Sequence, residues 1–324
     1  MKSGVLLRAA AAIAVAVCTL PLAAPPAAAQ PLVFVVPYPP GGSTDVIPRL
    51  LTPIVSRTAK TSVIVENRPG ANGSIGAAHV ARAAPDGHTV LMAPTGVLSI
   101  NQWLYKQLPY KPERDLAPIT NAATTPNMVV VSSSLPINSL QELIAMAKAK
   151  PDTLTFASSG NGSTSHLCGE LLRKMAGIDI VHVPYKGPGP AMQDVLSGRV
   201  TMMCEAFSNA MVHVRSGRLR ALVLAAQQPH PQAPSIPTSA QVGLPGFEAS
   251  AWFGFVAPSG TPAADIERVN RHLVDALRTP EVLKRFDDLG LTVVADSPAE
   301  FGRFIATESD KWRKIIELSG ATAD

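Results

Sequence analysis

Short apolar runs alternate with stretches of helical apolar spacing along the chain after residue 30. The run Leu32–Val36 is apolar without a break and ends at Pro37, which is typical of a strand buried on both faces of a sheet. The predicted strands are 32–36, 63–65, 89–93, 128–131, 154–157, 180–183, 200–204 and 219–225, and the predicted helices are 44–58, 75–84, 140–148, 166–175, 191–197, 210–215, 263–278, 280–289 and 298–318. This alternation predicts a doubly wound α/β architecture.

The first residues of the chain have the order of a secretory signal peptide. Lys2 and Arg8 give a positive start, residues 9–24 are almost wholly apolar, and small residues at 27–29 precede Gln30. A membrane anchor is the alternative, but the apolar stretch is interrupted by prolines and shorter than the ~20 residues of a spanning helix. We therefore expect residues 1–29 to be removed on export.

Composition and motifs argue against several classes of protein. Of the 324 residues, 46% are apolar, and 28 Lys+Arg against 24 Asp+Glu leave a net charge of only +4. That charge is too small and too dispersed for a nucleic-acid-binding protein. The chain has no phosphate-binding P-loop, complete dinucleotide fingerprint, nucleophile elbow or zinc-binding histidine pair. We expect no cofactor, no metal and no nucleic-acid partner.

Two cysteines remain after the predicted leader, Cys168 and Cys204. Neither belongs to a C-x-x-C motif, so zinc and redox roles are not indicated. We expect both to be small, buried apolar side chains, and pairing in an oxidising compartment is the alternative.

Two glycine-rich loops each follow a predicted strand and begin a predicted helix. Residues 39–45 read PPGGSTD, and residues 158–166 read SSGNGSTSH. Hydroxyls and the unpaired N–H groups of a first helical turn can together hold a carboxylate without an arginine. Either loop alone fits an ordinary strand–helix turn. Two such loops in different halves predict a small molecule with two carboxylates, held between domains.

Other strand ends add candidates. Asn72 and Gly73 lie in a further glycine-rich turn, and Thr95 follows a strand. Tyr185 also follows a strand, where it would contact the ligand or simply pack at the rim. Glu205 ends a strand; in the cleft it would repel a carboxylate unless it met an amine, a water or a loop amide, and the alternative is a charge at the rim.

His166 lies close in sequence to Ser159 and Ser163, which would suit a base and a nucleophile. No acid partner stands at motif spacing. The plainer interpretation is a polar residue in the first turn of a helix, and we expect no enzymatic activity.

The chain resembles a known family at several motifs in order. VPYPPGGSTD at 36–45, VENRPGANG at 65–73, APDGHT at 84–89, SSGNG at 158–162, HVPYKG at 182–187 and WFGFVAP at 252–258 resemble the substrate-binding proteins of tripartite tricarboxylate transporters, the Bug (TctC-like) family. The resemblance implies a periplasmic-binding-protein-like (type II) α/β fold, with two domains that close on a ligand. It also implies a periplasmic location and a monomer.

The resemblance carries the ligand-binding role to matching positions. Family ligands are mostly carboxylates, held by loop amides, hydroxyls and waters. The matching candidates are Pro40, Gly41, Gly42, Thr44, Asp45, Ser158, Ser159, Asn161, Ser163 and His166, and Tyr38 of the first motif is a further candidate. Four positions depart from the family pattern: Cys168 and Cys204 stand where it more often has a small and an aromatic residue, Glu205 replaces Asp or Asn, and Pro48 stands where alanine is common.

We expect one discontinuous domain of residues 30–130 plus 250–324 and a second of residues 131–249. Proline-rich residues 229–246 and residues 118–136 are the candidate boundaries. The predicted function is a receptor that delivers a small carboxylate to the membrane subunits of a tripartite tricarboxylate-type transporter. A ligand-presenting sensor for a membrane signalling protein and a secreted Ser/His hydrolase are the alternatives.

Overall fold

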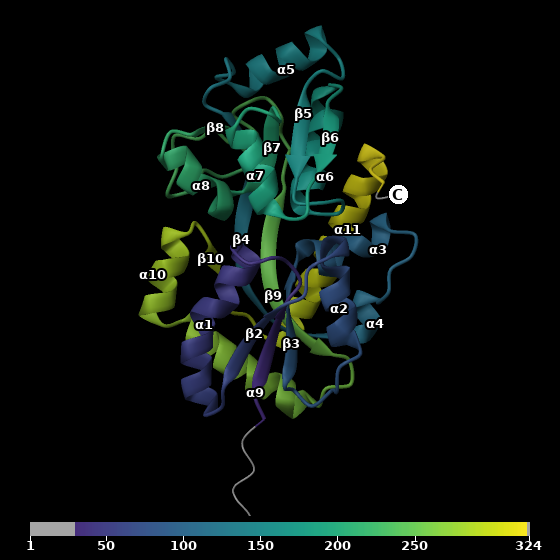
Figure 1. Ribbon diagram of the computed structural model, residues 1–324, viewed down its shortest axis with the longest axis vertical. Helices are drawn as coiled ribbons and strands as arrows, with labels where there is room; N and C mark the ends of the chain where they lie inside the picture. Colours follow the sequence, from purple (N-terminus) through teal and green to yellow (C-terminus); the bar gives the residue numbers. More distant parts are fainter. Residues whose placement is uncertain (1–29, 323–324) are drawn as a thin grey trace, which may run out of the picture.

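Two sets of parallel strands meet at a pair of long antiparallel strands in the computed structural model, which describes residues 30–322 (Figure 1). The predicted signal peptide lies outside the described residues. The sheet order is β2 (Val63–Asn67), β1 (Leu32–Val36), β3 (Thr89–Pro94), β9 (Ser250–Pro258), β4 (Leu116–Ser132), β7 (Met202–Ala206), β5 (Thr155–Ser158) and β6 (Val181–Pro184). Strands β8 (Leu219–Leu224) and β10 (Thr292–Val293) also pair with β4.

Strand β4 passes from one half of the molecule into the other. Residues 116–126 pair with β9, and residues 127–131 pair with β7. We call the part built on β2, β1, β3 and β9 the first half, and the part built on β6, β5, β7 and the end of β4 the second half. The domain boundaries expected from the sequence stay a prediction.

The two halves have the same strand order. Each half has three parallel strands, and the strand that comes first in the chain lies between the other two. An antiparallel strand pairs with one side of this group, so the orders in space are β2-β1-β3-β9 and β6-β5-β7-β4. The loops after β1 and β5 are therefore equivalent, and each leaves the carboxyl end of a central strand. In open α/β sheets, ligands bind at such ends.

Helices cover both faces of each half. In the first half they are α1 (Ser43–Ala59), α2 (Ser74–Ala81), α9 (Ala263–Leu277) and α10 (Pro280–Asp288), with the short turns η1 (Ala71–Gly73), η2 (Gly96–Ile100), α3 (Asn101–Leu104) and α4 (Pro112–Asp115). In the second half they are α5 (Leu140–Ala149), α6 (Thr164–Ala176), α7 (Pro188–Leu196) and α8 (Phe207–Arg215). Helix α6 ends at Gly177 in the left-handed conformation, as its sequence predicts.

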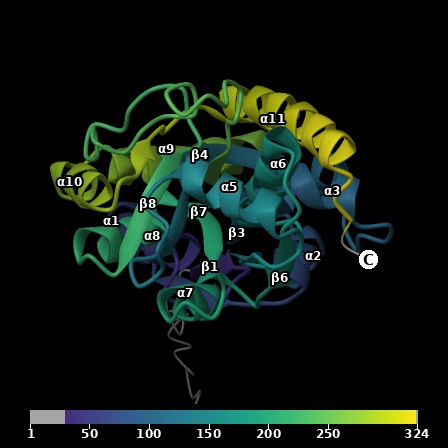
Figure 2. The ribbon, with the colours of Figure 1, turned by 90° about the horizontal axis from the view of Figure 1, so that it is seen from above.

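The last helix, α11 (Pro298–Ser319), joins the two halves and lies beside α6 (Figure 2). Near its start, Phe301 packs edge-on against Trp252 of β9, with ring centroids 5.7 Å apart. Near its end, Trp312 is buried in the core of the second half. Between them, one Glu308 oxygen accepts hydrogen bonds from the indole N–H groups of both tryptophans, each at 3.0 Å. The helix therefore fixes one edge of the molecule across both halves.

The sequence analysis missed β9 and most of β4. It predicted a strand only over residues 128–131 and a boundary over 118–136, whereas β4 is one strand of 17 residues. Pro118 and polar residues such as Thr120 and Asn121 conceal the strand pattern, and the register with β9 shifts at these positions.

Of the two interpretations that the sequence left open for the cysteines, the structure shows pairing, which was the alternative. Cys168 on α6 and Cys204 on β7 form a disulfide bond, with Cα atoms 5.9 Å apart. Both side chains are buried, as expected. The bond joins the helix that follows one glycine-rich loop to the strand that carries Glu205.

Replacing both cysteines by alanine should lower the free energy of unfolding by about 3–4 kcal/mol, because the crosslink closes a loop of 36 residues in the unfolded chain. Urea unfolding measures the change. Wild-type protein unfolded and refolded in a reductant serves as the control and should lose similar stability. Equal midpoints for oxidised wild type and the variant would contradict the prediction.

Candidate ligand-binding site

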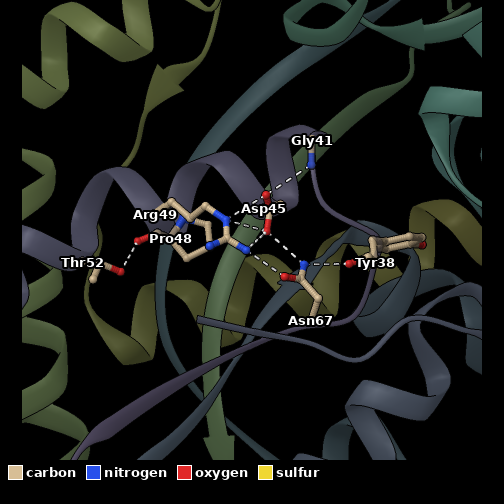
Figure 3. A network of polar contacts seen from close by, with 7 residues as sticks. All are labelled: Tyr38, Gly41, Asp45, Pro48, Arg49, Thr52 and Asn67. Atoms are coloured by element: carbon tan, nitrogen blue, oxygen red, sulfur yellow. Dashed lines mark hydrogen bonds and ion pairs between the residues drawn. The ribbon is translucent and has the colours of Figure 1, made fainter. Parts of the chain in front are cut away.

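The loop after β1 is held in place by a buried carboxylate. The Asp45 carboxyl, in the first turn of α1, accepts hydrogen bonds from Gly41 N–H at 3.2 Å and from Asn67 Nδ2 at 2.9 Å (Figure 3). Arg49 Nε lies 3.0 Å from both of its oxygens. Asn67 Nδ2 also donates to the carbonyl of Tyr38 at 3.0 Å. Asp45 therefore positions the loop, and its oxygens face the protein.

The ionised form of Asp45 is the favoured one. Burial alone would raise the pKa of this carboxyl, but hydrogen bonds from Arg49, Asn67 and Gly41 outweigh burial and hold the pKa below its ordinary value of 3.8. Gly42 precedes α1 and has no side chain to cap the helix. Other groups take its place: Ser43 N–H donates to Asn209 Oδ1 at 3.3 Å, and Asp45 N–H donates to the Gly42 carbonyl at 2.9 Å.

The equivalent loop after β5 is built from hydroxyl groups. Ser163 precedes α6; its Oγ accepts from His166 N–H at 3.2 Å and donates to the Gly160 carbonyl at 2.7 Å. Ser165 Oγ accepts from Ser159 N–H at 2.9 Å. Gly160 has φ +123°, which side chains rarely adopt. Hydroxyl and backbone groups of the loop itself therefore make most of the contacts that hold it.

The two loops face each other across one cavity of about 70 Å³, which we call the inner cavity. One water needs about 10–15 Å³ on this scale, so the cavity matches a small molecule. It is lined by Tyr38, Pro39, Gly42, Ser43, Thr44, Pro94, Thr95, Gly96, Ser159, Ser163, Thr164, Ser165, Pro188, Glu205, Ala206, Asn209, Ala251 and Phe253. None of these described residues is Lys, Arg or His. An anion here would be held by amides, hydroxyls and the ends of α1 and α6.

Contacts across the cleft hold the halves together on both sides of the inner cavity. Ser43 Oγ donates to Asn209 Oδ1 at 2.8 Å. On the other side, Tyr105 Oη donates to the Asn161 carbonyl at 2.8 Å. A Cβ added to Gly96 would lie 2.9 Å from the Gly162 carbonyl oxygen, so only glycine allows this approach. The structure is therefore a closed arrangement of the two halves.

Outside the Ser43–Asn209 bond lies a second hollow of about 420 Å³, which we call the outer groove. Its lining includes Pro40 and Gly41 from the first loop and the cationic Lys186. Two of the sequence candidates thus lie at the entrance.

The structure places seven of the sequence candidates on the wall of the inner cavity: Tyr38, Gly42, Thr44, Thr95, Ser159, Ser163 and Glu205. Asn72 and Gly73 lie behind the wall, where Asn72 accepts a hydrogen bond from the Tyr38 hydroxyl and donates to Asn101 Oδ1 at 2.8 Å. The Tyr185 hydroxyl donates to Asp194 at 2.7 Å, which turns it toward α7.

Ser158 and His166 belong to a buried layer under the second loop. Ser158 Oγ lies 2.6 Å from His182 Nε2, and the rings of His166 and His182 stack with centroids 4.1 Å apart. His166 Nδ1 accepts from Gly162 N–H at 3.2 Å. The pKa of His166 is lowered to about 3, mainly by burial and to a smaller extent by electrostatic repulsion from His182.

The serine–histidine arrangement of the hydrolase alternative is not among the contacts of residues 30–322. Ser159 Oγ donates to Glu205, and Ser163 Oγ to Gly160. The described part of the chain also contains no helix long and apolar enough to cross a membrane. It holds no cluster of three or more metal-ligating side chains either.

The sequence analysis missed Ser43 and Asn209. Ser43 stands inside the first motif, and only the closed arrangement reveals its contact with the other half. Asn209 lies in the first turn of α8, four residues after Glu205 of β7, and its Nδ2 donates to Glu205 Oε1 at 3.0 Å. No local signal in the sequence indicates this contact, because the chain changes from strand to helix between the two residues.

The variant Asp45→Asn should destabilise the protein by about 1–3 kcal/mol at pH 7, because the hydrogen bonds around Asp45 include charged groups. The folded-state pKa lies below 3.8, so this stabilisation is complete above that pH and is lost as the pH falls through the folded-state pKa. Urea unfolding at pH 7 and below 3.8 should therefore show the difference from wild type shrinking in acid. A difference that is constant with pH would contradict this account.

Comparisons with known proteins agree with this geometry. BugT of Bordetella pertussis is 38% identical over 316 residues, which are 96% of this chain and 97% of BugT. The solved structure of R. palustris Rpa4515 with adipate has a TM-score of 0.88 at 31% identity and covers 91% of this chain and 98% of that one. MatC from Rhodopseudomonas palustris with bound malate has a TM-score of 0.85 at 33% identity, and the match covers 89% of this chain and 99% of MatC.

These solved structures confirm the expected fold, a type II periplasmic-binding-protein fold with two α/β domains. A family described as "Tripartite tricarboxylate transporter family receptor" matches residues 47–321, most of the described chain. The motifs, the fold and this match together show that the chain belongs to the tripartite tricarboxylate transporter receptor family, also known as the Bug or TctC family.

Proposed function

We propose that this chain binds a small dicarboxylate in the inner cavity and delivers it to the membrane subunits of a tripartite tricarboxylate-type transporter. The supporting observation is that two helix-initiating loops from equivalent positions in the two halves line one cavity. Each loop offers hydroxyls and backbone N–H groups to one end of the ligand. The dicarboxylates adipate and malate in the structures of Rpa4515 and MatC support this ligand class.

The proposed mechanism is hinge closure. Strand β4 continues from one half into the other, and its partner β9 contributes Ala251 and Phe253 to the cavity wall, so bending of these strands between the halves would open the cavity. The ligand would stabilise the closed arrangement by bonding to both loops at once. The transporter would recognise that arrangement in the periplasm, where the predicted signal peptide directs the chain. The receptor would act as a monomer.

Thermal unfolding of residues 30–324, refolded to remove carried-over ligand, tests the proposal with succinate, malate and adipate. A ligand at about 100 times its dissociation constant adds roughly 2.7 kcal/mol of stability. That corresponds to a rise in melting temperature of several degrees.

Binding to Ser159→Ala and Thr44→Ala, measured by titration calorimetry, should weaken by about tenfold or more, because Thr44→Ala loses a hydroxyl donor to the ligand and Ser159→Ala loses the hydroxyl that holds Glu205 in the cavity wall. Thr307→Ala removes an exposed hydroxyl on α11, far from the cavity lining, and should bind like wild type. If no carboxylate binds the wild-type protein, the proposed ligand class is wrong.

Delivery is tested in cells with the identified ligand in labelled form. Deleting the gene should abolish its uptake at low concentration, and the wild-type gene, but not the Thr44→Ala variant, should restore it. Uptake that is unchanged by the deletion would contradict a role in transport.

A further inference from the structure

Glu205 is a carboxyl group in the wall of a cavity that we assign to a carboxylate. Its side chain is only 4% exposed, and it lines the inner cavity from the end of β7. Its Oε1 accepts from Ala206 N–H at 2.9 Å and from Asn209 Nδ2 at 3.0 Å. Its Oε2 accepts from Ser159 Oγ at 3.2 Å. Glu205 is thus held firmly, and only neutral groups hold it.

No cation among the described residues is placed to compensate Glu205 in the inner cavity. The ionisable groups on the surrounding elements are either neutral, already paired or outside the cavity. Burial raises the pKa of Tyr38 and lowers those of His166 and His182 to about 3 and 4, so all three are neutral at pH 7. Three acids on neighbouring helices have arginine partners, namely Asp45 with Arg49, Glu170 with Arg173 and Asp194 with Arg199. Lys186 and His213 line the outer groove, beyond the Ser43–Asn209 bond.

A second negative charge in this cavity would face Glu205 without a counter-ion. Two carboxylates that share a site of low polarity do not both remain ionised, and one of them takes up a proton. Oε2 is the atom that can carry it, because both bonds to Oε1 remain intact and the new O–H can donate to a ligand oxygen. Burial raises the pKa of Glu205 even without a ligand, against the opposing effect of its three hydrogen bonds.

We infer that this receptor binds its carboxylate ligand together with one proton, which is held on Glu205. The inference rests on the proposed function. Protonated Glu205 supplies a hydrogen-bond donor to the ligand, in a cavity whose other donors are amides and hydroxyls.

Titration calorimetry with adipate from pH 6 to pH 10 tests the inference, with each pH measured in two buffers of different ionisation enthalpy. The pair of buffers counts the protons taken up on binding. Wild-type protein should take up as much as one proton per adipate, and its affinity should fall by about tenfold per pH unit where the uptake is complete.

The variant Glu205→Gln keeps nearly the same side-chain shape but cannot take up a proton. Its carbonyl oxygen can accept from Ala206 and Asn209, and its amide group can donate where Oε2–H would. The variant should bind adipate at every pH, with little proton uptake and a flat profile. Glu170→Gln is the matched control, because it removes a buried carboxylate from α6 that does not line the cavity, and it should behave like wild type.

Two results would overturn the inference that Glu205 takes up a proton. Binding of adipate without proton uptake, and with the same pH profile in wild type and Glu205→Gln, would overturn the inference. So would tighter binding of a matching amino dicarboxylate that is lost in Glu205→Gln, because Glu205 would then be an ammonium site. The wild-type proton count stands even if the variant fails to fold. If no carboxylate binds wild type at any pH, the proposed function itself fails.

Discussion

The hydrogen-bonded ladder between β4 and β9 is the constraint on which the rest of the structure depends. Strand β4 pairs with β9 in the first half and with β7 in the second half, so it runs from one half into the other with β9 as its antiparallel partner. Because these two strands fix where each half begins, they determine that the carboxyl ends of β1 and β5 face one another. A cleft between such ends is then a consequence of topology, and the loops provide its chemistry.

The chemistry of the cleft depends on dipoles instead of full positive charges. Hydroxyls, backbone N–H groups and the starts of two helices surround the inner cavity, and its one acidic side chain lies among neutral donors. A site of this kind holds an anion less strongly than an arginine pair would, and it releases the anion more readily on opening. That balance suits a receptor that has to give up its ligand. Asp45 and Arg49 contribute indirectly, by fixing the loop that leads into the cavity wall.

Much of the α/β pattern and both glycine-rich loops could be predicted from the sequence, because local signals specify them. An unbroken apolar run such as Leu32–Val36 indicates a buried strand, and Gly177 marks a helix end. The long β4 could not be recognised, since its prolines and polar residues are tolerated only through its neighbours. Contacts between the halves, such as Ser43 with Asn209, join residues 166 positions apart and depend on closure. The disulfide was left open for the same reason, because spacing does not reveal that α6 and β7 bring the two sulfur atoms together.

The shared strand order of the halves gives the cleft an approximate internal two-fold symmetry. A ligand with two identical ends, such as a straight-chain diacid, would meet equivalent loops in either of two orientations. The third strands break this symmetry: β3 is followed by Thr95, a neutral hydroxyl, whereas β7 ends beside the carboxyl of Glu205. An unsymmetrical ligand would therefore have one preferred orientation in the cleft. The difference between Thr95 and Glu205 would determine which end of the ligand faces which half.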